Sequence, residues 1–247
     1  QCEVVGVGKY GLTAPTVPLY VGNSGTTMRL LAGLLAGQRF DSVLEGDESL
    51  SKRPMDRVVI PLRSMNADIS GVGEKNHPPL IVKGRQLRGA VHYERLGSAQ
   101  VKSALLLAGL YAEGRTIVVE KRPSRDHTER MLDLFGAQFK RDNDTLTIVG
   151  ASTFKAISDF VIPGDISSAA FFMVAGSIIP GSDIVLKDVC LNQTRSGIIQ
   201  VLRQMGATIE VTEQKRQGEP CGDIHVKYSH LHGVTVTDDI LPSLIDE

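Results

Sequence analysis

A glycine-rich turn and a proline corner carry the residue types that bind small anions. Residues 22–29 (GNSGTTMR) are typical of a turn that opens an apolar helix, and residues 50–55 (LSKRPM) set Arg53 beside a proline. The start of a helix offers unpaired backbone N–H groups and a partial positive charge. An arginine adds a planar fork that matches a carboxylate or a phosphate. The two segments therefore predict a site for a small, strongly acidic metabolite.

Three copies of one unit position these segments. An apolar stretch ending in glycine recurs at residues 30–33, 106–109 and 173–176, and a second landmark falls near residues 66, 136 and 206. The period is about 70 residues, which is typical of a repeat architecture. In each copy a first helix, a strand and a second helix are expected. The predicted first helices are 26–37, 100–112 and 167–178, the strands 41–45, 115–120 and 183–187, and the second helices 55–65, 125–135 and 193–205.

Two further strands close each unit, as at residues 137–141 and 145–149, because apolar residues there recur with the strand period of two. The fold class is therefore α/β, built from repeated β-α-β-α-β-β units. A unit this small cannot bury both of its helices alone, so we expect apolar helices inside and sheets outside. Residues 159–163 look like an extended crossover, and we predict a first lobe over 1–162 and the start of a second over 163–247.

The composition narrows the function classes. The chain has 247 residues, and its 27 basic side chains nearly balance 28 acidic ones, so a nucleic-acid-binding surface is not expected. Its three cysteines are widely spaced without a metal-type pair, which favours a reducing, cytoplasmic compartment. No apolar run is long enough to cross a membrane. Both ends fall within apolar segments, so we predict that the chain is a fragment of a longer protein.

Five motifs, in order, resemble those of the 5-enolpyruvylshikimate-3-phosphate synthase family. They are GNSGTTMR at 22–29, LSKRPM at 50–55, GSAQVKS at 97–103, SRDHTE at 124–129 and GDISSA at 164–169. The resemblance covers essentially the whole chain. It implies the enolpyruvyl transferase fold of two inverse β-prism lobes, each with three such units. It also implies transfer of the enolpyruvyl group of phosphoenolpyruvate to shikimate 3-phosphate, with release of phosphate.

The resemblance assigns residues to phosphoenolpyruvate. The positions matching Gly25 and Arg53 line that substrate's site in the family, Gln100 faces it, and Asn23 can both cap the helix and contact ligand. Glycine lets a ligand approach the backbone closely because it has no Cβ. The alternative for the turn is an ordinary helix cap by Asn23 or Ser24. Arg29, one turn further on, is expected to be structural support.

The resemblance assigns another group to shikimate 3-phosphate. The matching residues are Ser98, Gln100, Ser124 and, in a bacterial subgroup, Arg125, while Ala99 can offer only its backbone amide. Ser98 and Ser124 are equally good helix caps, so that alternative stays open.

Three nearby residues have other expectations. Lys102 is expected either near the phosphate or exposed. His127 has no partner carboxylate in its motif and is not expected to be catalytic. Asp165 is expected to be a helix cap.

Asp246 matches the carboxylate that the family uses on the shikimate 5-hydroxyl. A carboxylate within hydrogen-bond reach of that proton can act as the base. Further substrate-binding residues of the family would lie before Gln1 and after Glu247, so we predict that residues 1–247 alone are inactive. No metal and no organic cofactor are expected, the two metabolites are the only predicted partners, and the resemblance implies a monomer.

Two alternatives remain. One is the related transferase that acts on UDP-N-acetylglucosamine and uses a cysteine in a flexible loop. Cys2, Cys190 and Cys221 do not stand in such a loop context. The other is a ligand-binding fragment without catalytic activity. The family's response to glyphosate gives no clear expectation here, because Gly25 is typical of sensitive members whereas Leu30 replaces a common proline.

Overall fold

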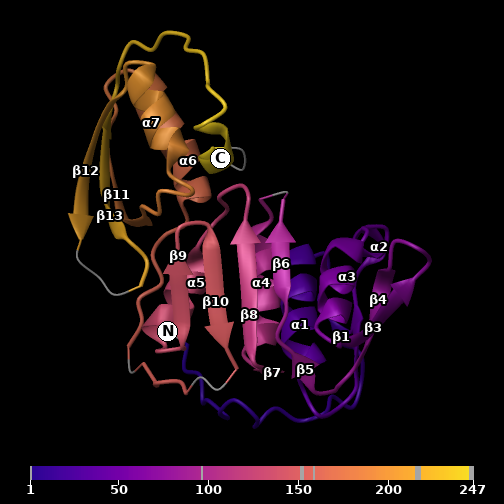
Figure 1. Cartoon of the computed structure of the whole chain (residues 1–247). Helices are drawn as coiled ribbons and strands as arrows, with labels where there is room; N and C mark the ends of the chain where they lie inside the picture. Colours follow the sequence, from indigo (N-terminus) through magenta and orange to yellow (C-terminus); the bar gives the residue numbers. More distant parts are fainter. Residues whose placement is uncertain (1, 96, 151–152, 158, 215–217, 245–247) are drawn as a thin grey trace. The chain divides into compact units, whose positions relative to one another are not determined.

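The structure is a computed structural model that describes residues 2–95, 97–150, 153–157, 159–214 and 218–244. The chain forms two compact units (Figure 1). The first comprises Gln1–Pro123 and Phe135–Lys155, and the second Ser124–Leu134 and Ala156–Glu247. The lobe boundary after residue 162 stays a prediction. Within the described residues, no helix combines the length and the apolar composition that crossing a membrane requires.

The first unit contains two four-stranded sheets with the same topology. The first sheet has the order β1-β2-β4-β3, formed by Leu19–Tyr20, Ser42–Glu45, His77–Lys83 and Asp68–Val72. The second has the order β6-β8-β10-β9, formed by Val91–Glu94, Arg115–Glu120, Thr145–Val149 and Phe139–Asp142. In each sheet a parallel edge pair is followed by antiparallel pairs. A short parallel pair, β5 (Leu87–Arg88) with β7 (Ala112–Glu113), is separate.

The repeated order of elements confirms the predicted β-α-β-α-β-β unit. The first copy runs β1, α1 (Gly25–Ala36), β2, α3 (Asp56–Ser64), β3 and β4, with a short α2 (Glu48–Ser51) inserted. The second runs β6, α4 (Ala99–Gly109), β8, α5 (His127–Leu134), β9 and β10. In the third, a parallel bridge between Gly164 and Val189 stands where the first strand would be. The chain is thus mixed α/β, as the sequence pattern indicated.

Helices α1 and α4 form the interior of the first unit, as expected. They pack directly on each other, so closely that a Cβ built on Gly33 would lie 2.1 Å from the carbonyl oxygen of Ala104. Residues 101–106 of α4 are all buried. Burying both helix faces at once is what makes this pair apolar on nearly all sides.

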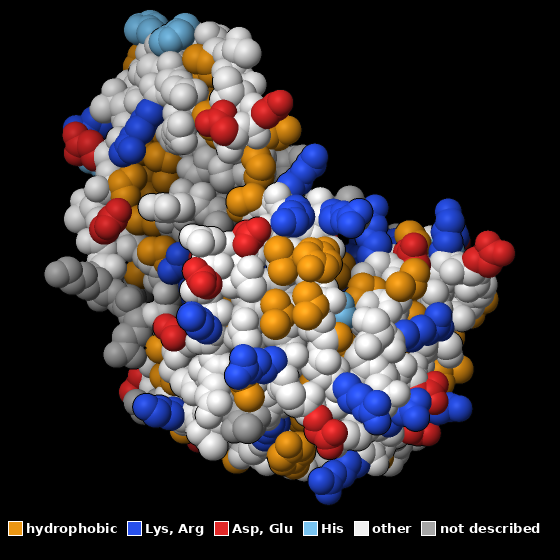
Figure 2. Space-filling view, in the orientation of Figure 1, with side chains coloured by type: hydrophobic (Ala, Val, Ile, Leu, Met, Phe, Trp, Pro, Cys, Tyr) orange, Lys and Arg blue, Asp and Glu red, His pale blue; other side chains and the backbone are white. Residues whose placement is uncertain are grey.

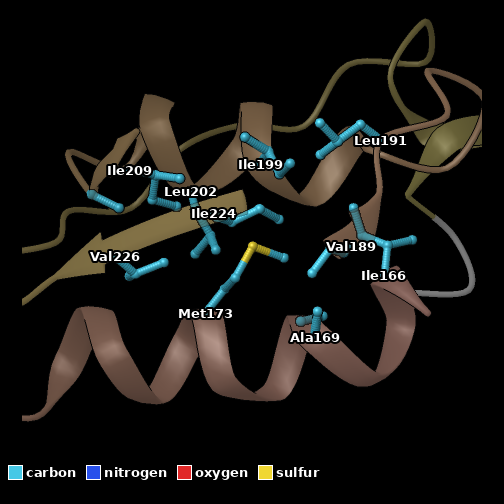
Figure 3. Packing of buried hydrophobic residues seen from close by; sticks show 12 residues of the cluster. Ile166, Ala169, Met173, Val189, Leu191, Ile199, Leu202, Ile209, Ile224 and Val226 are labelled. Carbon is cyan, nitrogen blue, oxygen red and sulfur yellow. The ribbon is translucent and has the colours of Figure 1, made fainter. Parts of the chain in front are cut away.

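The second unit has one three-stranded sheet and its own core. The sheet order is β11-β13-β12, formed by Asp183–Cys190, Cys221–Lys227 and Thr208–Gln214. Helices α6 (Ile166–Ile178) and α7 (Gly197–Gln204) contribute to a hydrophobic cluster with this sheet (Figure 3). Met173 of α6 points toward Ile224 and Leu202 in that cluster. A 3-10 turn, Leu241–Ser243, lies against the start of α7.

The start of α7 differs from the prediction. The helix begins at Gly197 rather than at residue 193. The side chain of Asn192 explains the delay, because its Oδ1 accepts hydrogen bonds from the N–H of Thr194 at 2.9 Å and from its hydroxyl at 2.7 Å. This local turn competes with helical hydrogen bonding. Helix α5 likewise begins two residues later than predicted, at His127.

Candidate anion-binding site

The turn before α1 is capped by Ser24. Its hydroxyl accepts from the N–H of Thr27 at 3.1 Å, whereas Asn23 is exposed. Ser24, not Asn23, is therefore the N-cap. The N–H of Gly25 donates to the carbonyl of Asn23 at 3.1 Å. The backbone of this tight turn therefore uses the amide of Gly25 itself.

Two guanidinium groups border Gly25 instead. A Cβ built on this buried glycine would lie 3.3 Å from Nη1 of Arg29 and 3.5 Å from Nη1 of Arg53. Burial lowers the pKa of Arg29, and the positive charges of Arg53 and Arg57 lower it further. Cations held this close repel one another, and a bound anion would offset that repulsion. Gly25 therefore lies in a strongly positive environment that suits a small acid.

Gln100 joins the starts of α1 and α4. Nη1 of Arg29 donates to Oε1 of Gln100, and Nε2 of Gln100 donates to the hydroxyl of Thr26 at 2.7 Å. Both partners lie on α1, roughly one repeat earlier in the chain. Arg29 thus acts as the structural support that was expected, and it fixes the amide of Gln100 in one orientation. Gly25, Arg53 and Gln100, which were predicted together from the sequence, are brought together.

The start of α4 already holds a carboxylate. Ser98 is the N-cap, with its hydroxyl accepting from the N–H of Val101 at 3.4 Å. Oε2 of the buried Glu94 accepts from the N–H groups of Gly97 at 2.5 Å and Ser98 at 3.1 Å. Sequence reasoning missed Glu94. The strand pattern offered no signal for it, because alternation would bury the apolar Val91 and Tyr93, whereas these are exposed and His92 and Glu94 are buried.

Lys102 is neither exposed nor at the surface of the site. It is fully buried, and its Nζ lies 3.0 Å from Oε1 of Glu120 on β8. The expectation of an exposed lysine is therefore wrong. A buried ammonium needs an ionic partner, and the partner comes from the strand beneath the helix. On the surface, Lys and Arg side chains gather at the end of the first unit where β6 and β8 finish (Figure 2).

The remaining residues that were predicted to bind substrate lie outside the first unit or at the start of α4. Ser124 and Arg125 belong to the second unit, are half-buried and directly precede α5. Ala99 opens α4 as its first residue and is half-buried. Asp246 lies outside the described residues.

His127 has a carboxylate partner after all. Its Nδ1 lies 2.7 Å from Oε1 of Glu219, a residue 92 positions later in the chain. No local motif could reveal this pairing, because it depends on the fold of the second unit. Asp165 is the N-cap of α6, as expected, with Oδ2 accepting from the N–H of Ser168 at 3.0 Å.

An open groove in the second unit is separate from these residues. It has a volume of about 970 Å³ beside α7, and Arg130, Gln200 and Arg203 are among its lining residues. None of the predicted ligands that the structure describes lines it. The groove is thus distinct from the adjoining helix starts that hold Gly25 and Gln100.

Acid should destabilise the second unit first. Five described carboxyl groups of this unit have a lowered pKa: Asp126, Asp165, Asp183, Glu219 and Asp239. For Asp126 and Glu219, burial alone would raise the pKa, but hydrogen bonds from Arg130 or His127 and from Asn192 outweigh it.

A carboxyl with a lowered folded pKa stabilises the fold above its ordinary pKa and loses this contribution as the pH falls through the folded value. We expect amide signals of the second unit in NMR spectra to disappear before those of the first as the pH falls below about 4. Earlier loss of the first unit's signals would contradict this.

Comparison with known proteins now gives the family. The family model described as EPSP synthase (3-phosphoshikimate 1-carboxyvinyltransferase) matches residues 1–246. A 3-phosphoshikimate 1-carboxyvinyltransferase from Bacillus pumilus is 51% identical over 98% of this chain and 56% of its own length. One from Desulforamulus reducens is 50% identical over 100% of this chain and 58% of its own length.

A solved EPSP synthase from Acinetobacter baumannii has a TM-score of 0.90 at 51% identity, covering 98% of this chain and 55% of that one. The chain thus spans a little over half the length of these relatives. Two adjoining helix starts bordered by arginines, a repeated β-α-β-α-β-β unit and a match over essentially every residue agree with one another. The chain belongs to the EPSP synthase (3-phosphoshikimate 1-carboxyvinyltransferase) family.

Proposed function

We propose that the protein containing this chain transfers the enolpyruvyl group of phosphoenolpyruvate to the 5-hydroxyl of shikimate 3-phosphate and releases inorganic phosphate. The observation that carries the proposal is the group formed by Gly25, Arg29, Arg53 and Gln100, where the starts of α1 and α4 adjoin. Two guanidinium groups beside a glycine form a compact positive site, and phosphoenolpyruvate is small and carries both a carboxylate and a phosphate.

We take the residue roles from family membership. Arg53 binds phosphoenolpyruvate beside Gly25, with Asn23 at the edge of the turn and Gln100 facing the same substrate. Ser98, Ala99 and Gln100 at the start of α4, together with Ser124 and Arg125, bind shikimate 3-phosphate. Asp246 takes the proton of the 5-hydroxyl.

The reaction is an addition followed by an elimination. The 5-hydroxyl oxygen attacks C2 of phosphoenolpyruvate while its proton passes to Asp246, and C3 of the double bond gains a proton. The resulting tetrahedral adduct then loses a proton from C3 and expels phosphate, which restores the double bond. The guanidinium group of Arg53 offsets the negative charge on the adduct. The absence of metal and cofactor requirements, the monomeric state and the cytoplasmic location stay predictions.

The related UDP-N-acetylglucosamine transferase is the less favoured function. That chemistry would call for a reactive cysteine, whereas Cys190 and Cys221 are buried. Burial also raises the pKa of the Cys190 thiol, which reduces its thiolate fraction. Cys2 is exposed but lies outside the five motifs.

The function is tested by giving the complete natural protein phosphoenolpyruvate with either shikimate 3-phosphate or UDP-N-acetylglucosamine. We expect phosphate release and an enolpyruvyl product only with shikimate 3-phosphate. Saturable binding of both metabolites without product would instead support a non-catalytic ligand-binding protein. Residues 1–247 alone are expected to show no turnover, because the chain spans only a little over half the length of its relatives.

A pair of variants tests the role assignment. Arg53→Ala should raise the KM for phosphoenolpyruvate about tenfold, because it removes a charge-assisted contact to that substrate alone. Asp246→Ala should lower kcat about a hundredfold, the lower range for loss of a general base. Lys52→Ala, which removes an exposed neighbouring charge paired with Glu48, is the control. Steady-state kinetics in both substrates decide the matter, and unchanged constants in both variants would refute the assignment.

A further inference from the structure

A single buried side chain connects three segments of the second unit. Asn192 is fully buried, at 0% exposure, in the loop between β11 and α7. Its Nδ2 donates to Oδ1 of Asp126 at 2.7 Å and to Oε2 of Glu219 at 3.0 Å. Its Oδ1 accepts both hydrogen bonds from Thr194. The carboxamide therefore uses both of its donors and both of its acceptor positions, which is the full capacity of an asparagine.

The connection reaches the start of α5 from a distant part of the chain. Asp126 and His127 stand at that helix start, and Asn192 and Glu219 contact them from positions 66 and 92 residues later in sequence, respectively. His127 contacts one oxygen of Glu219 while Asn192 contacts the other. Two loops that are distant in sequence from α5 thus form hydrogen bonds with its start.

Two carboxylates surround the side chain of Asn192, and its neutral amide donates a hydrogen bond to each of them. Asp126 and Glu219 both present an oxygen to the same amide nitrogen, so two carboxylates lie close together. Nε of Arg130 lies 3.0 Å from Asp126 and 4.0 Å from Glu219 and offsets part of their repulsion. The pKa values of both carboxyl groups are lowered, which fits ionised groups held by donors.

Two residues that are proposed to bind shikimate 3-phosphate also lie at the start of α5. Ser124 and Arg125 precede Asp126 directly in the chain. Consecutive Cα atoms are a fixed distance apart. Anchoring Asp126 and His127 therefore limits where Ser124 and Arg125 can lie. A substrate-binding group that is held in place loses less conformational entropy when its ligand binds.

We propose that Asn192 and Glu219 form a clamp that positions Ser124 and Arg125 for the phosphate of shikimate 3-phosphate. Both are positioning residues, because they act through α5 and not by touching the substrate. The inference rests on the proposed function for its consequence in binding, whereas the clamp itself can be tested without any substrate.

The sharpest variant is Asn192→Asp, which keeps the shape of the side chain. It replaces the shared donor by a third carboxylate between Asp126 and Glu219. We expect the KM for shikimate 3-phosphate to rise about tenfold, with kcat and the KM for phosphoenolpyruvate changed by less than about twofold. Because crowded carboxylates raise one another's pKa, the defect should shrink as the pH falls from about 8 to about 6.

A second variant guards against simple misfolding. When Asn192→Asp is combined with Glu219→Gln, the amide introduced at position 219 can donate to the carboxylate introduced at position 192, while its oxygen still accepts from His127. We expect the double variant to bring the KM for shikimate 3-phosphate only part of the way back, because the repulsion from position 219 is relieved whereas Asp126 still faces a carboxylate at position 192. Asn143→Asp, the same change at an exposed turn between β9 and β10, is the matched control and should leave every constant unchanged.

Hydrogen exchange of the amides in residues 126–134, measured without substrate, separates the clamp from the proposed function. The clamp predicts faster exchange there in Asn192→Asp, partly restored in the double variant, whichever substrate the protein uses. Unchanged exchange would overturn the clamp. Faster exchange with an unchanged KM for shikimate 3-phosphate in an active enzyme would overturn the positioning role. A protein that does not bind shikimate 3-phosphate at all would instead overturn the proposed function, while the exchange result still decides the clamp.

Discussion

Replacement of Lys102 by methionine is expected to lower the free energy of unfolding of the first unit by about 3–5 kcal/mol. Lys102 and Glu120 are buried together, with side-chain exposures of 0% and 3% and atoms 3.0 Å apart. Methionine has a similar volume, so the change leaves little cavity. It does take the ammonium away from the carboxylate of Glu120 in a region from which water is excluded, and that is the costly step.

Two further variants separate this effect from loss of packing. Lys102→Met with Glu120→Leu removes both charges, and we expect it to recover most of the lost stability, because apolar replacement of a whole buried pair is often neutral. Lys52→Met breaks the exposed pair with Glu48, whose side chains are 72% and 88% exposed, and should cost less than about 0.5 kcal/mol.

Urea unfolding, with the first unit followed by its own NMR signals, measures all three variants. Equal losses in Lys102→Met and Lys52→Met would contradict the argument. So would a double variant that is no more stable than Lys102→Met, since the stability would then depend on the ammonium itself and not on the buried carboxylate that it neutralises.

Local features of the site could be predicted from the sequence. Ser24 and Asp165 cap helices because serine and aspartate oxygens accept from amides two or three residues ahead, a property set within one turn of chain. The three repeats followed from internal similarity, and most of the predicted helices and strands lie where the repeats put them, although α5 and α7 begin later than predicted. Gly25, Arg53 and Gln100 could be grouped because their motifs recur in one family's order.

Long-range pairings could not be predicted in this way. Lys102 pairs with Glu120, and Glu219 pairs with His127. In the second case the partners are 92 residues apart, and in both cases the contact exists only once strands and helices have packed. Periodicity reports which face of an element is buried, but not which charged residue meets it there.

The repeated glycines show the same limit in another form. The same apolar stretch ends in a glycine in each of the three repeats, at Gly33, Gly109 and Gly176. The sequence identified these glycines only as landmarks of the repeat. In the structure each stands where a Cβ would meet a neighbour closer than 3.0 Å. The neighbour differs from repeat to repeat: it is backbone of Ala104 for Gly33, but side-chain atoms for the other two glycines. Their tolerance to substitution should differ accordingly.

Gly33→Ala is therefore expected to destabilise the first unit by about 3 kcal/mol, near the upper end for overpacking. In an exposed helix the same change would stabilise by about 1 kcal/mol, because glycine is a poor helix former. Here the added methyl would lie 2.1 Å from the carbonyl oxygen of Ala104 and 2.8 Å from its Cα. Neither atom can move without shifting α4, so α1 and α4 must separate, and the clash outweighs the gain in helix propensity.

Gly176→Ala is the matched control at the equivalent position of the third repeat. Its methyl would meet Cδ1 of Ile184 at 2.8 Å, the far end of a flexible side chain that can turn aside. We expect a change within about 1 kcal/mol, because the propensity gain and the rotamer cost nearly cancel. Chemical unfolding of both variants, followed separately in each unit, makes the comparison.

The separation of α1 from α4 should also break the hydrogen bond between Arg29 and Gln100. Gly33→Ala should therefore weaken phosphoenolpyruvate binding even where the unit stays folded. A Gly33→Ala protein as stable as Gly176→Ala would show that the two helices can move apart freely. The close packing of α1 on α4 would then not be what holds the two helix starts together.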